Sequence, residues 1–94
     1  MLVERSEILV KQGSEEGFAD AMRERGVPLL ASLKGVGEVR FGRGVENPDK
    51  FILLVEWESM DAHVAFTQTD SYPRLRELMA PFTRGGGMEH FTMM

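Results

Sequence analysis

Two histidines are the residues of this chain best suited to move protons near neutral pH, since an unperturbed imidazole has a pKa of about 6.5. They are His63 and His90. His63 has three interpretations: a base that accepts a proton from a phenol, an exposed helix residue near Asp61, or a partner in a structural hydrogen bond. His90 is expected to pair with a neighbour at a subunit interface rather than to act in catalysis.

The sequence predicts neither a metal site nor a cofactor. It contains no cysteine, which excludes thiolate ligands, disulfides and a cysteine nucleophile. The two histidines lie far apart in the sequence and belong to no metal-ligand motif. The glycine-rich segments 42–44 and 85–87 lack the strand–loop–helix spacing of a phosphate-binding loop.

Two aromatic side chains and one arginine are candidates for holding a ligand. Trp57, the only tryptophan, is either a core ring or the wall of a pocket for a flat aromatic molecule. Offset stacking on such a wall adds roughly 0.5–1.5 kcal/mol beyond the burial of area. Tyr72 and Arg74 follow a predicted helix break, where a pocket mouth is expected, and are candidates for binding a substrate oxygen. Their alternatives are a ring packed on the core and a surface charge.

The elements that position these residues follow from the hydrophobic pattern. The unbroken apolar run Phe51–Val55 predicts a strand buried on both faces, and Ser59 after it is a suitable N-cap for a helix. The rest of the chain is divided, by residue numbers, into a strand at 5–11, a helix at 14–34 kinked near 25–27, a strand at 36–45 with a bulge near its glycines, helices at 60–68 and 72–82, a flexible connector at 85–87 and a closing strand at 88–94.

This order predicts an α+β, ferredoxin-like βαββαβ fold in which helices cover one face of a four-stranded antiparallel sheet. The chain forms one domain, residues 1–94. On the central strand, Ile52 and Leu54 point to the face without helices, where residues of the last strand are expected to add apolar area. Soluble monomers avoid such a patch, so a homodimer through this sheet face is expected, giving a dimeric α/β barrel.

Composition limits the partners of the protein. The formal net charge of -4, with basic residues scattered along the chain, argues against nucleic acid and against an anionic membrane surface. No apolar run approaches the roughly 20 residues that cross a bilayer, and charges interrupt the N-terminal segment where a signal peptide is apolar. A cytoplasmic protein is therefore expected.

Nearly the whole chain resembles the antibiotic biosynthesis monooxygenase family, the first half in architecture only and the segment from Trp57 to Tyr72 most specifically. The resemblance rests on Glu56-Trp57-Glu58-Ser59, on Ala62, Phe66, Thr69, Tyr72 and Leu75, on the pair Pro81-Phe82, and on Met88-Glu89-His90-Phe91. It implies the dimeric α/β barrel fold and, as an activity, cofactor-independent oxidation of aromatic quinols or anthrones. In such an enzyme Trp57 and Phe66 would contact the substrate, His63 would be the base, and Tyr72 or Arg74 would hold a substrate oxygen.

Two departures from the family pattern bear on activity. Family members often carry a histidine at the position of Phe66, whereas the histidine here stands three residues earlier, at His63. The haem-degrading branch uses an asparagine on the first strand and a histidine on the second helix, and this chain has neither. Haem degradation is not expected. The alternatives to a monooxygenase are a non-catalytic aromatic-ligand-binding or stress-response barrel, and an isomerase or decarboxylase on the same scaffold.

Overall fold

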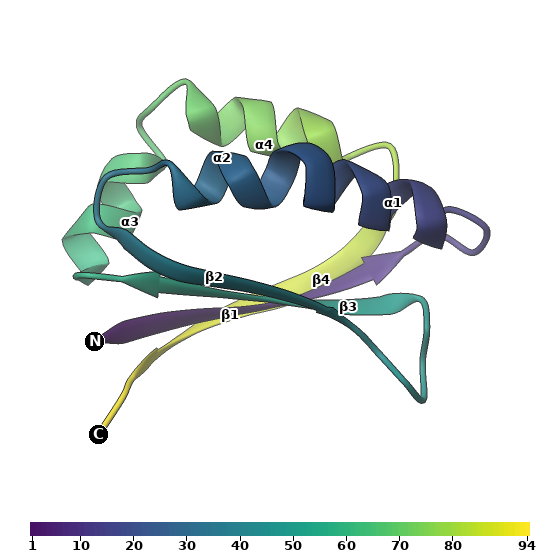
Figure 1. Ribbon diagram of the computed structural model, residues 1–94, viewed down its shortest axis with the longest axis horizontal. Coiled ribbons are helices and arrows are strands. Elements are labelled where there is room, and N and C mark those ends of the chain that lie inside the picture. The colour runs from purple at the N-terminus through teal and green to yellow at the C-terminus, as the bar shows by residue number, and fades with distance from the viewer.

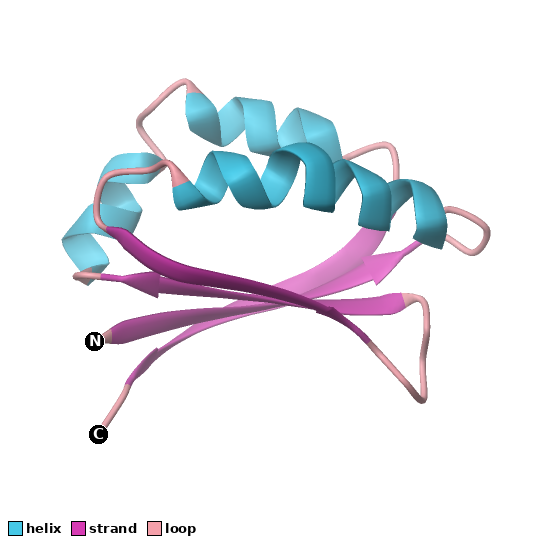
Figure 2. Ribbon diagram, in the orientation of Figure 1, coloured by secondary structure: helices cyan, strands magenta, loops and turns pink.

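The structure, a computed structural model, describes residues 1–94 and has the predicted ferredoxin-like architecture. Helices lie on one face of a four-stranded sheet, and the other face is bare (Figures 1 and 2). The elements are, in chain order, β1 (Leu2–Val10), α1 (Glu15–Ala21), the π-helical turn η1 (Met22–Gly26), α2 (Val27–Ala31), β2 (Val36–Arg43), β3 (Lys50–Trp57), α3 (Met60–Phe66), α4 (Ser71–Met79) and β4 (Thr83–Thr92). None of these helices has the length and apolar character that a membrane span requires.

The sheet has the strand order β2-β3-β1-β4, and every neighbouring pair is antiparallel. The two central strands, β1 and β3, are therefore joined on both sides, and β4 is an edge strand. Side chains alternate between the faces of a strand. On β3, Phe51, Val55 and Trp57 point to the helices and are at most 1% exposed. Ile52 and Leu54 point to the bare face and are half-buried, as the sequence predicts.

The helix layer is irregular where glycine and proline occur in its sequence. The predicted kink near residues 25–27 is present as the π-helical turn η1, after which Pro28 stands in the first turn of α2. A Cβ atom at Gly26 would lie 2.6 Å from the sulfur of Met22, so a larger residue at this turn would force the buried Met22 side chain to shift. The helix ends at Ala31, earlier than predicted, and a short turn leads to Gly35 in the left-handed conformation (φ 85°).

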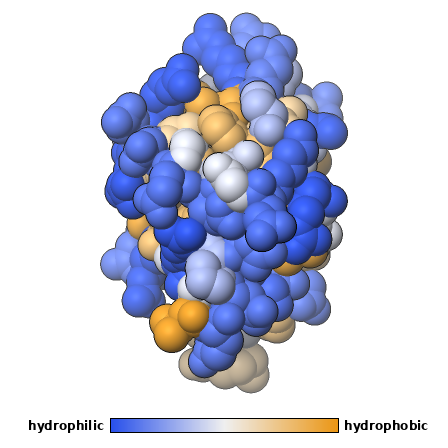
Figure 3. Space-filling model, turned by 90° about the vertical axis from the view of Figure 1, so that its right-hand side faces the viewer, coloured by the Kyte–Doolittle hydropathy of each residue, from blue (hydrophilic) through white to orange (hydrophobic).

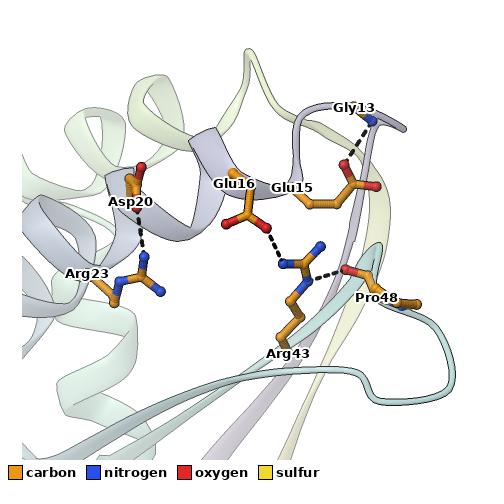
Figure 4. A network of polar contacts seen from close by, with 7 residues as sticks. All are labelled: Gly13, Glu15, Glu16, Asp20, Arg23, Arg43 and Pro48. Atoms are coloured by element: carbon orange, nitrogen blue, oxygen red, sulfur yellow. Dashed lines mark hydrogen bonds and ion pairs between the residues drawn. The ribbon is translucent and has the colours of Figure 1, made fainter.

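A polar network ties the start of α1 to the hairpin between β2 and β3. Arg43 donates to the carboxylate of Glu16 at 2.6 Å and to the carbonyl oxygen of Pro48 at 2.7 Å (Figure 4). This end of the molecule lies opposite α3, and hydrophilic side chains cover most of it (Figure 3). The site residues described below lie at the other end.

Two local predictions for the sheet are wrong. The bulge expected near Gly42 and Gly44 is absent there, and the register of β2 against β3 shifts instead between Val36 and Val39. The expected flexible connector at 85–87 is part of β4, which begins at Thr83. Glycine serves here because the strands approach closely: a Cβ atom at Gly86 would lie 2.1 Å from the carbonyl oxygen of Glu7.

The glycines of β4 give a first testable prediction. Gly86→Ala places a Cβ against the β1 backbone at a residue with a positive φ of 146°, so we expect a loss of about 1–3 kcal/mol in the free energy of unfolding. Gly87→Ala is the matched control, because a Cβ there meets no atom within 4 Å; its effect should stay within about 0.5 kcal/mol. Urea unfolding measures both, and equal stabilities of the two variants would contradict this account of β4.

Candidate functional site

A buried polar cluster lies on the helix side of the sheet, at the end where β3 runs into α3. Its members are Glu4 on β1, Trp57 at the end of β3, His63 on α3 and His90 on β4. The register brings them together: Glu4 is directly opposite His90 on one side and Val55 on the other, and Trp57 follows Val55 by two residues on the same face. Residues from both ends of the chain therefore meet the junction of β3 and α3 at one point.

Glu4 is the centre of this cluster and is only 5% exposed. Its Oε1 accepts a hydrogen bond from the indole Nε1 of Trp57 at 3.0 Å, and its Oε2 accepts one from the hydroxyl of Ser6 at 2.8 Å. The same Oε1 lies 3.5 Å from Nε2 of His63. A buried carboxylate is tolerated only where donors replace water, and these three groups supply them.

The sequence reasoning did not select Glu4 as a functional residue. A signal was available, because Glu4 and Ser6 are in phase with Ile8 and Val10 along β1, all four pointing to the helices. A carboxylate in phase with the core positions of a strand is unusual, because buried carboxylates almost always have a hydrogen-bonding or charged partner.

His63 is buried rather than exposed, so the interpretation as a surface helix residue is wrong. The hydroxyl of Ser59 accepts from the backbone N–H of Ala62 and caps α3, as the sequence predicts, which fixes the first turn of this short helix. His63 then points at the sheet and is 9% exposed. Its ring meets that of Trp57 edge-on, with centroids 5.3 Å apart.

Burial lowers the pKa of His63 below its ordinary value of 6.5. The carboxylate of Glu4 acts in the opposite direction, and His90 lowers the pKa further, since two neighbouring imidazolium ions repel each other. The net effect is a His63 that is neutral at pH 7 and has a lone pair available for a proton. Glu4, at 3.5 Å, is placed to stabilise the imidazolium that would result.

His90 meets His63 within the same chain, with ring centroids 4.4 Å apart. Its predicted pairing at a subunit interface is therefore not needed to explain its position. In each ring one buried nitrogen has no hydrogen-bond partner: Nδ1 of His63 and Nε2 of His90. One ligand-type atom from each of Glu4, His63 and His90 falls within 4.8 Å of the others, so the two histidines, distant in sequence, form one donor cluster with the glutamate.

Four of the five residues selected from the sequence form a continuous aromatic cluster. The centroids of Trp57 and Phe66 are 5.7 Å apart, and those of Phe66 and Tyr72 are 5.4 Å apart. With the edge contact of His63 on Trp57, this aromatic cluster extends from the end of β3 through α3 to the start of α4. The fifth residue, Arg74, is exposed and lines a separate groove of about 500 Å³ with side chains of η1, α2 and α4.

Trp57 itself is fully enclosed and lines none of the five principal hollows of the molecule. Phe66 lines one of them, a cavity of about 390 Å³ between α3 and the turn after α2 that also involves Leu33 and Ala62. The helix side of β4 is less well covered: Met88, two residues before His90 and on the same face, is 52% exposed. The cluster is thus enclosed by Trp57 on one side, and its more exposed residues, His90 and the neighbouring Met88, lie on the edge strand.

The fold and the cluster together define a class: small ferredoxin-like proteins with a histidine and glutamate cluster at one end of the sheet. Comparison with known sequences identifies the family within this class. Residues 1–78 match the sequence profile of the family described as antibiotic biosynthesis monooxygenase. The chain belongs to this family. The matched part contains Glu4, Trp57 and His63 and ends before β4, which carries His90.

Individual relatives resemble the chain over almost its whole length. The uncharacterized protein YczJ of Bacillus subtilis (strain 168) is 31% identical over 93 residues, which cover 97% of each chain. A crystal structure from Bordetella bronchiseptica, of a protein assigned to the antibiotic biosynthesis monooxygenases, has a TM-score of 0.88 at 29% identity and covers 99% of this chain and 96% of its own. A solved structure from Nitrosomonas europaea, with the same assignment, has a TM-score of 0.86 at 18% identity and covers 100% of this chain and 99% of its own. At that identity it shows the fold alone.

The lowered pKa of His63 gives a prediction for the pH dependence of stability. Between the pKa of the folded state and 6.5 the unfolded chain binds more protons at this residue, so the free energy of unfolding rises with pH in that window and falls on acidification. In buffer with EDTA, the wild-type protein should lose more stability between pH 7.5 and 5.5 than His63→Gln, measured by urea unfolding. Asp61→Asn, on the exposed side of the same helix, should keep the wild-type slope. Equal slopes for wild type and His63→Gln would contradict the assignment.

Proposed function

We propose that this member of the family is a homodimeric, cofactor-independent monooxygenase that oxidises electron-rich polycyclic phenols of the quinol or anthrone type, with His63 as the base. The observation that carries the proposal is the position of His63: buried, neutral near pH 7, in edge contact with Trp57 and 3.5 Å from the carboxylate of Glu4. A base of this kind accepts a proton in a dry site and is stabilised once charged.

The substrate would enter from the side of β4. Met88 is exposed and His90 half-buried on that side, whereas Trp57 and Phe66 close the opposite side. In this arrangement Phe66 contacts the aromatic rings of a substrate, the enclosed Trp57 supports the His63 ring from behind, and the half-buried Tyr72 holds a substrate oxygen. Arg74 faces a different groove, so the proposal assigns the oxygen contact to Tyr72.

The chemistry needs no bound cofactor because the substrate supplies the electrons. His63 removes a proton from the carbon between the rings of an anthrone, leaving a carbanion delocalised onto the neighbouring oxygen. The carbanion reduces molecular oxygen and forms a carbon–oxygen bond, and protonation gives a hydroperoxide. Loss of water from it leaves the ketone, so one oxygen atom enters the product and the other leaves as water. The protein contributes orientation, a dry site and the base.

A dimer through the bare sheet face completes the proposal. That face carries apolar side chains from three neighbouring strands: Val3 and Leu9 of β1, Ile52 and Leu54 of β3, and Phe91 of β4. Phe91 is 43% exposed, and the other four are half-buried. Charged residues share this face, with Arg5 opposite Leu54 and Glu7 opposite Ile52. They form ion pairs within the chain, Arg5 with Glu89 and Lys50 with Glu7, so their charges are already balanced when a second copy packs on the face.

A non-catalytic aromatic-ligand-binding barrel is the alternative function. The complete enclosure of Trp57 favours it, because a ring that is 0% exposed offers no free wall for catalysis. The cavity beside Phe66 would then hold the ligand.

Oxygen uptake tests the catalytic proposal. With an anthrone as substrate and EDTA present, the wild-type protein should consume oxygen faster than the uncatalysed reaction, and His63→Ala should lose about 10²–10⁴-fold of that rate because the base is gone. Asp61→Asn is the control on the same helix and should retain it. Uptake no faster than the background across quinols and anthrones would refute the oxygenase. Quenching of Trp57 fluorescence by the same compounds would then support the binding alternative.

Sedimentation tests the dimer. The wild-type chain should have twice its monomer mass at micromolar concentration, and Leu54→Lys should shift it to the monomer by placing an unpaired charge in the interface. Val64→Lys, at a 50% exposed position on α3, is the matched control and should remain dimeric. A wild-type protein of monomer mass at that concentration would contradict the dimer.

A further inference from the structure

We infer that Glu4, His63 and His90 form a binding site for one divalent first-row transition-metal ion, with Zn²⁺ and Co²⁺ as its simplest occupants. The inference goes beyond the proposed function and does not rest on it. It rests on which atoms converge at the cluster, on how they are held and on which of them have no partner.

The donor set suits such an ion. Two imidazoles and one carboxylate are ligands that zinc, iron, cobalt and nickel accept in proteins, whereas magnesium and calcium prefer oxygen ligands alone. The three residues come from β1, α3 and β4, so side chains of three separate elements would coordinate the ion. Three protein ligands also leave room in the coordination sphere for water or an added ligand.

The carboxylate of Glu4 is already oriented by neighbours that can stay in place when it binds an ion. Trp57 donates to Oε1 at 3.0 Å and Ser6 donates to Oε2 at 2.8 Å. Oε1 also lies 3.5 Å from Nε2 of His63, a contact that an ion bound between the two side chains would replace. Hydrogen bonds from outer residues to a ligating carboxylate are typical of protein metal sites and tune their affinity.

The histidines provide the second observation. His63 is nine-tenths buried, yet its Nδ1 has no partner, and Nε2 of His90 is buried without one as well. Most buried polar groups in proteins are paired, so two unpaired nitrogens in rings that touch each other require an explanation. Coordination is a direct one, because a metal ion uses the lone pair of a neutral imidazole and orients both rings.

The spacing is close to that of a bound ion without equalling it. The three ligand-type atoms lie within 4.8 Å of one another. On a tetrahedral zinc ion with Zn–N distances of about 2.0–2.1 Å, two ligand atoms lie roughly 3.4 Å apart. Side chains must therefore draw inward on binding. His90 is half-buried on an edge strand and has the freedom to do so.

Metal binding and base catalysis would exclude each other at this cluster. An imidazole nitrogen that ligates an ion no longer accepts a substrate proton, so a bound ion should inhibit the oxidation proposed above. Occupancy by metal would then convert His63 from a base into a metal ligand.

Titration of the metal-free protein tests the site. The chain has only two histidines of its own, so any histidine tag, which would itself bind metal, is removed first. The full chain is then freed of metal with EDTA and dialysed. Co²⁺ binding is measured by visible absorption and Zn²⁺ binding by calorimetry. We expect one ion per chain and a higher Tm in its presence. His90→Ala should weaken binding at least about 10–100-fold. Glu89→Gln, beside His90 but on the opposite face, should bind like the wild type.

Two outcomes would overturn the inference. In the first, micromolar protein shows neither a Co²⁺ absorption band nor a heat of Zn²⁺ binding. In the second, His90→Ala binds metal as tightly as the wild type. Glu4→Gln gives a second check, with circular dichroism in the absence of metal to show that it is folded. Failure here is distinguishable from failure of the proposed function. Metal binding without oxygen uptake would refute only the oxygenase, and uptake without metal binding would refute only the metal site.

Discussion

The buried carboxylate of Glu4 is the interaction on which the functional end of the molecule depends. A carboxylate that is 5% exposed requires donors to replace its water, and it finds them on three elements. Trp57 donates from the end of β3, Ser6 donates from β1 itself, and Nε2 of His63 lies close by from α3. The Trp57 bond holds the end of the most buried strand against its neighbour. The contact of His63 with Glu4 helps to position α3, a helix of seven residues, in addition to the packing of Phe66.

The same carboxylate gives the cluster its chemical versatility. An anion beside an imidazole favours the charged ring, and burial together with a second imidazole opposes it; for His63 the opposing effects prevail. The result is a neutral histidine next to a negative oxygen. That arrangement serves a base, which gains a charge during reaction, and equally a metal ion, which brings its charge with it. The two uses employ one electrostatic design and differ in what supplies the positive charge.

The sequence predicted the fold because its elements carry strong local signals. The apolar run of β3, the N-cap at Ser59 and the glycine and proline of the irregular first helix all specify structure within a few residues. The site was predicted only in part. Trp57 and Phe66 were found as aromatic residues, but the contact between His63 and His90 depends on which strands pair and in what register, and no local pattern contains that. Glu4 was missed although its phase with Ile8 marks it as inward-pointing.

The placement of His90 shows how strictly the cluster depends on register. His90 faces Glu4 because β4 pairs with β1 in one alignment, and a slip by a single residue would turn His90 to the bare face and bring a neighbour inward. The close approach of Gly86 to the carbonyl of Glu7 helps to fix that alignment, because no other residue type fits there without strain. Gly86, which the sequence suggests is part of a flexible connector, therefore influences a residue four positions along β4. It helps to keep His90 on the face of the sheet where His63 contacts it.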